Sequence, residues 1–116
     1  MTASAQYPVD RDRPYQEERE SGLHARVFER VRIDLDHAGT FAAPFTGDEH
    51  RLVRAREEVT ECQHAVASGE YDRATFGEAL TAIQRVVDLN RLSDRSRSLL
   101  VDDLASLCDL QARWEG

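Results

Sequence analysis

Lysine is absent from this chain of 116 residues, and all 15 basic residues are arginine. Arginine codons are GC-rich, so this usage indicates the coding bias of a GC-rich bacterial genome rather than a chemical role. The net charge of −7 argues against nucleic acid as a partner, because binding phosphates requires clustered positive charge. Such an acidic surface favours solubility or a basic protein partner.

Cysteine is scarce, with only Cys62 and Cys108 in the chain. Two cysteines so far apart are too few for a disulfide framework or a cysteine-rich zinc site. Both fall at apolar positions of predicted helices, so we expect both thiols to be buried as small hydrophobic side chains. In a bundle of alternating helices they would lie on diagonal helices, too far apart for a disulfide.

Long apolar runs and strand-like alternation are also missing. No stretch approaches the roughly 20 apolar residues of a membrane helix, and the first 19 residues contain no apolar core of signal-peptide length. We therefore expect a cytoplasmic protein that has no membrane partner.

Helical periodicity dominates what is present. Residues 1–13 lack it and are expected to form a flexible tail, whereas residues 14–116 are expected to form one helical-bundle domain. The fold class predicted is all-α, an antiparallel four-helix bundle with a flexible N-terminal tail. The alternative is a three-helix core with a loosely attached first helix. The predicted apolar stripes are Leu23, Val27, Phe28, Val31, Leu35 and Ala38; Leu52, Ala55, Val59, Cys62 and Val66; Phe76, Ala79, Leu80, Ile83, Val86 and Val87; and Leu100, Leu104, Leu107, Leu110 and Trp114.

Start and stop signals bound these helices. Ser21 is expected to cap the first, which Gly39 ends. Thr46 and Glu49 fit a capping box at the start of the second, which Gly69 ends. Asp72 is expected to cap the third helix, which ends at Asn90, and Ser93 to cap the fourth.

The connection "HAGTFAAPFTGDEH", residues 37–50, places Phe41 and Phe45 in a predicted loop. These rings could seal the bundle end against Leu92 and Leu100, or form a docking patch. Several other apolar residues also lie off the stripes, in the half of the bundle nearest this loop, with Tyr71 as an exception at the far end. The predicted partner-binding residues are Ile33, Phe41, Phe45, Val53, Leu89, Leu92 and Val101.

Metal-ligating types occur at helical spacing in Glu61–His64, an E-x-x-H pair, and in Asp34–His37. Glu57, Glu61 and His64 face away from the apolar stripe of their helix, and His37 and His64 lie at opposite heights in the bundle, so no metal or cofactor is predicted. The weak candidates are His24, His37, Glu57, Glu61 and His64. His24 itself lies on a stripe and is expected to be a structural histidine or, less probably, a pH-sensitive contact.

The chain contains no glycine-rich phosphate loop, nucleophile elbow or Ser/His/Asp set, so an enzyme is not expected. The function predicted is a small acidic helical binding or regulatory protein, an adaptor, that acts through a protein–protein interface at one bundle end or self-associates there as a homodimer. One alternative is a metal- or cofactor-binding bundle. The other is a neutraliser of a basic protein, resembling an immunity protein or antitoxin in its charge.

Overall fold

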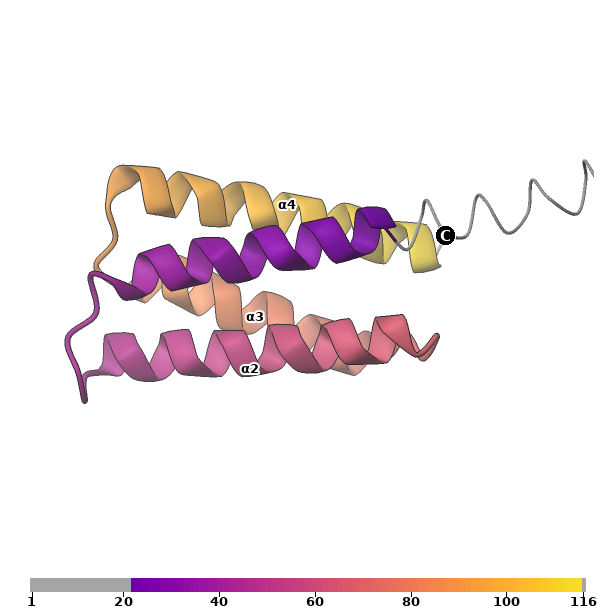
Figure 1. Cartoon of the computed structure of the whole chain (residues 1–116), viewed down its shortest axis with the longest axis horizontal. Helices are drawn as coiled ribbons and strands as arrows, with labels where there is room; N and C mark the ends of the chain where they lie inside the picture. The colour runs from indigo at the N-terminus through magenta and orange to yellow at the C-terminus, as the bar shows by residue number, and fades with distance from the viewer. Residues whose placement is uncertain (1–21, 116) are drawn as a thin grey trace, which may run out of the picture.

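A computed structural model describes residues 22–115. They form four helices and no strand: residues 22–39, α2 (Gly47–Ala67), α3 (Arg73–Leu89) and α4 (Asp94–Glu115) (Figure 1). The all-α, four-helix prediction is therefore confirmed. The predicted tail at residues 1–13 and the Ser21 cap lie outside the described residues.

Successive helices run back and forth along the long axis of the molecule (Figure 1). The connections at residues 40–46 and 90–93 lie together at one end, which we call the loop end. The turn at residues 68–72 and the last turn of α4 lie at the opposite end, which we call the aromatic end. Hydrogen bonds fit this arrangement, because Asp48 at the start of α2 contacts Asn90 at the end of α3.

Side-chain caps start the helices where the sequence predicts. The Thr46 Oγ1 accepts the Glu49 amide at 3.3 Å, and Ser93 Oγ accepts the Ser96 amide at 3.1 Å. Asp72 caps α3 by accepting the Ala74 amide at 3.2 Å. One detail differs from a standard capping box: the Glu49 carboxylate reaches back to the amide of Phe45 at 3.0 Å, one residue before the cap.

All four helices contribute to one core. Phe28, Val31, Leu35 and Ala38 of the first helix are fully buried, so this helix is an integral part of the bundle. Leu23, predicted on its stripe, is instead exposed. His24 occupies the inward position in that turn, because it lies closer than Leu23 to the angular position of Phe28 on the helix.

Aromatic rings close the aromatic end. Trp114 of α4 lies 5.4 Å from Tyr71 in a stacked arrangement and 5.6 Å from Phe76 edge-on, measured between ring centroids. His24 meets Trp114 edge-on at 4.6 Å, which agrees with a structural role for this histidine. The Tyr71 hydroxyl donates to the Glu115 carboxylate, which also pairs with Arg73 at 3.4 Å.

Candidate functional site

The connection at residues 40–46 is organised by its own short-range hydrogen bonds. The amides of Thr40, Phe41 and Ala42 donate to carbonyls three residues earlier at 3.1–3.2 Å. The Thr46 hydroxyl donates to the carbonyl of Ala43 at 2.5 Å. Ala42, rather than either phenylalanine of the loop, packs against the core.

Phe45 combines an unusual backbone conformation with a fully exposed side chain. Its φ of 63° lies in the left-handed region, which costs an ordinary side chain roughly 1–2 kcal/mol. Its side chain is 99% exposed, so no burial within the chain offsets this cost. The amide of Phe45 is fixed by Glu49, so the ring projects from a defined backbone.

Phe41 is 52% exposed. The hypothesis that both rings seal the bundle end is wrong for Phe45. Leu100 is fully buried and Leu92 packs against the core. The Phe45 ring covers neither of them, because it is 99% exposed. The physical reason is that the small Ala42 covers the core at this connection, which leaves the larger ring outside.

The remaining apolar residues assigned to the docking patch divide into two groups. Leu92 is partly buried against the core, whereas Ile33, Val53, Leu89 and Val101 are exposed. Ile33, Val53 and Val101 each lie opposite the buried stripe of their own helix, so they point outward from three different helices. Of the predicted partner-binding residues, only Phe41 and Phe45 belong to the connection at residues 40–46.

A polar network, rather than apolar contacts, fixes the loop end. The buried Asn90 amide accepts from Arg51 Nε at 2.6 Å and donates to the Asp48 carbonyl at 2.9 Å. Asp48 also pairs with Arg51 at 2.7 Å and accepts the Arg91 amide at 3.0 Å.

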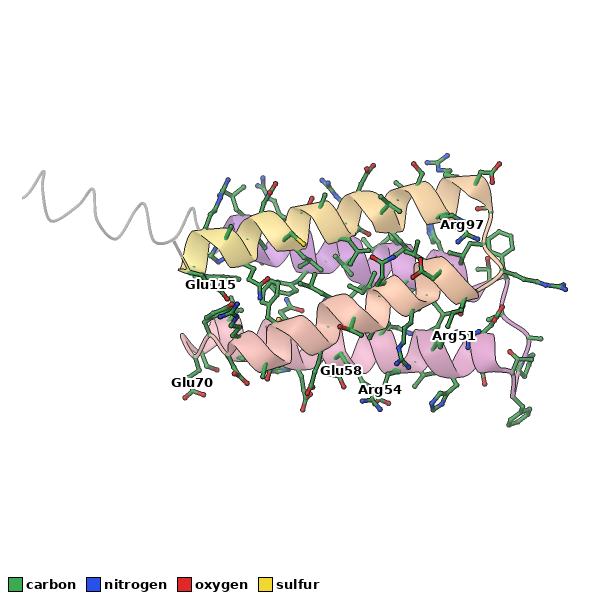
Figure 2. All side chains as sticks on the ribbon, turned by 180° about the vertical axis from the view of Figure 1, so that it is seen from behind. Arg51, Arg54, Glu58, Glu70, Arg97 and Glu115 are labelled. Atoms are coloured by element: carbon green, nitrogen blue, oxygen red, sulfur yellow. The ribbon has the colours of Figure 1, made fainter. Side chains whose placement is uncertain are left out.

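Arg97 extends this network from α4. It donates to the carbonyls of Val87 and Asn90, at the same end of the molecule as Arg51 (Figure 2). The sequence indicates Asn90 only as the end of a helix. Its hydrogen bond to Asp48 requires the end of α3 to lie beside the start of α2, which no local pattern reveals.

A buried acid pair is a second feature that sequence analysis missed. Asp103 of α4 is 2% exposed and faces Asp34 of the first helix, which is also buried. Removal from water raises the pKa of Asp103 to about 8, and hydrogen bonding to Asp34 and its negative charge add to this rise, while Arg30 opposes it. One carboxylate oxygen of each residue, Asp34 Oδ2 and Asp103 Oδ2, is buried without a hydrogen-bond partner in the described part of the chain. The signal in the sequence was an aspartate between Leu100 and Leu107 on the apolar stripe of α4.

The weak metal candidates are not assembled into a site. Within residues 22–115 no three or more His, Cys, Asp or Glu side chains are placed to hold a metal ion. Glu57, Glu61 and His64 border a shallow hollow on the surface of α2, and His37 is exposed on the first helix.

The two cysteines have different environments. Cys62 is buried as predicted, and removal from water raises the pKa of its thiol to about 12. Cys108 is exposed, so the prediction that it is buried is wrong. It follows the buried Leu107 directly, and one residue turns about 100° around a helix, which carries Cys108 out of the stripe.

No family model, curated protein or solved structure matches the chain. The helices of the described region include none with the length and apolar character needed to cross a membrane.

Proposed function

We propose that this chain is a non-enzymatic binding protein that docks a protein partner at its loop end, with Phe45 as the anchor and Phe41 beside it. The observation that carries the proposal is the 99% exposed Phe45 ring on a backbone of positive φ. This backbone conformation costs folding free energy, and the ring makes no buried contact that would offset the cost. Such a combination is typical of a residue kept for binding.

The energetics of such an anchor are favourable. Burying a phenylalanine side chain in a partner pocket contributes roughly 1.5–3 kcal/mol. The capping bonds of Thr46 and Glu49 already order the loop, which lowers the entropy lost on association. Asp48 and Glu49 follow immediately in the first turn of α2, so a suitable partner has an apolar pocket with basic groups at its rim.

The test is quantitative co-purification from native cells, followed by reconstitution with the purified partner. Phe45→Asn removes the ring and suits the left-handed backbone, since asparagine tolerates that region. Val101→Asn is the matched control, because it removes an exposed apolar side chain from the outward face of α4. We expect Phe45→Asn to lose the partner and Val101→Asn to retain it.

Two results would contradict the proposal. Equal capture by wild type and Phe45→Asn would exclude the ring as an anchor. Capture that is insensitive to Phe45→Asn but weakens steeply with salt would favour the alternative, a neutraliser that binds a basic protein through charge.

A further inference from the structure

A groove between α2 and α3 extends from His50, in the first turn of α2, along both helices. The groove is open to solvent and has a volume of about 540 Å³. Its lining includes Arg54, Glu58, Gly77, Glu78, Thr81 and Arg85. Figure 2 shows Arg54 and Glu58 beside α3 on this side of the molecule. The groove is lined by charged and small side chains rather than by large apolar ones.

The charges along the groove are separated by sign. Glu58 of α2 and Glu78 of α3 face one another across it. Arg54 lies one turn from Glu58, and Arg85 lies two turns from Glu78, both toward the loop end. The groove therefore has an acidic half near Gly77 and a basic half near Arg85.

Glu58 is poorly compensated within the chain. It is 8% exposed, and its Oε1 lies 3.4 Å from Arg54. Its Oε2 is buried without a hydrogen-bond partner in the described part of the chain, beside a second carboxyl. Burial and the charge of Glu78 raise the pKa of Glu58, and the nearby Arg54 opposes this rise.

Close packing within residues 22–115 does not require a glycine at position 77. It lies in the second turn of α3, where glycine is less favourable than alanine. A Cβ built there would meet no atom within 4 Å. Ala74 and Thr81 lie on the same face at spacings of three and four, so this face of α3 allows another helix to approach closely.

We propose that this face is the interface between two copies of the chain, with α3 packed antiparallel to α3 of the second copy about a two-fold axis near Thr81 and Ala82. Such an axis places Glu78 opposite Arg85 of the second copy, and Arg85 opposite its Glu78. The acidic half of each groove then meets the basic half of the other, as an isologous interface requires. The same axis sets Leu89, which is 59% exposed, opposite the small Ala74 of the second copy.

Charge reversal tests this arrangement. Glu78→Arg places two arginines opposite each other in the dimer, and Arg85→Glu places two glutamates opposite each other. Within one chain, Glu78→Arg faces Glu58 across the groove, and Arg85→Glu faces Arg54. Each new charge is opposite in sign to the residue it faces, so the helical fold should be retained. Circular dichroism checks that retention.

Sedimentation equilibrium on the full chain is the measurement. We expect wild type to approach twice its monomer mass of 13.2 kDa, and each single variant to dimerise at least about tenfold more weakly. An equimolar mixture of Glu78→Arg and Arg85→Glu should restore dimers, because both contacts of the heterodimer are then complementary. Monomeric wild type at millimolar concentration would overturn the proposal, as would failure of the mixture to restore dimers.

A steric variant tests the same interface independently. Gly77→Leu should abolish dimers, whereas Ala105→Leu, at an exposed position of α4, should leave them intact. Phe45→Asn should not change the dimer. Loss of dimers with Phe45→Asn but not with Gly77→Leu would place self-association at the loop end and refute the α3 interface.

Discussion

At the aromatic end Tyr71, Phe76 and Trp114 pack on one another, whereas at the loop end Phe41 and Phe45 lie largely in solvent. Each end has a short connection that carries aromatic residues outside the apolar stripes, Tyr71 at the aromatic end and Phe41 and Phe45 at the loop end. At the aromatic end, the rings close the core and Tyr71 is tied to Glu115. At the loop end, Asn90 and its polar partners perform the closure.

This difference separates stability from binding. Aromatic contacts of this kind contribute about 0.5–1.5 kcal/mol per pair beyond the burial of area, so the aromatic end stabilises the fold directly. The loop end is stabilised by hydrogen bonds to buried groups, and the fully exposed Phe45 ring adds no burial to it. A side chain released from folding can be used for association.

The largest expected effect is at the aromatic end. Trp114→Ala removes the ring that contacts His24, Tyr71 and Phe76, and we expect the free energy of unfolding to fall by about 2–4 kcal/mol. Urea unfolding followed by circular dichroism measures this loss. A change below about 0.5 kcal/mol would remove the contrast between the ends.

A smaller effect is expected from the polar network at the loop end. Asn90→Ala leaves Arg51 and the Asp48 carbonyl without their partner, which should cost about 1–3 kcal/mol. Gln84→Ala is a suitable control, because Gln84 bonds only Asp88 on the surface of α3. Equal unfolding midpoints for the two variants would show that the network does not hold this end.

The acid pair between the ends predicts a pH dependence. The pKa of Asp103 is raised from 3.8 to about 8, so the folded protein holds a proton that the unfolded chain releases. Stability should therefore fall as pH rises from about 4 to 8 and then level off. The raised pKa of Glu58 acts in the same direction.

Asp103→Asn tests this assignment, because asparagine keeps the shape and cannot ionise. We expect the variant to lose less stability than wild type between pH 6 and pH 9, measured as the thermal midpoint at each pH. Parallel slopes for the two proteins would contradict a raised pKa at Asp103.

The sequence predicted the fold more completely than it predicted the site. The stripes and the caps at Thr46, Asp72 and Ser93 are local patterns, and local hydrogen bonds realise them. The exposure of Phe45 could not be derived, because it depends on a positive φ and on Ala42 covering the core in its place. The pairing of Asp34 with Asp103 likewise depends on which helices become neighbours.

The role proposed for Phe45 in binding, rather than in folding, is tested most directly by comparing Phe45→Asn with wild type in urea unfolding and in partner capture from the same preparation. We expect an unfolding free energy that is unchanged within about 0.5 kcal/mol or is slightly higher, together with loss of the partner. Marked destabilisation, or full retention of the partner by the variant, would contradict it.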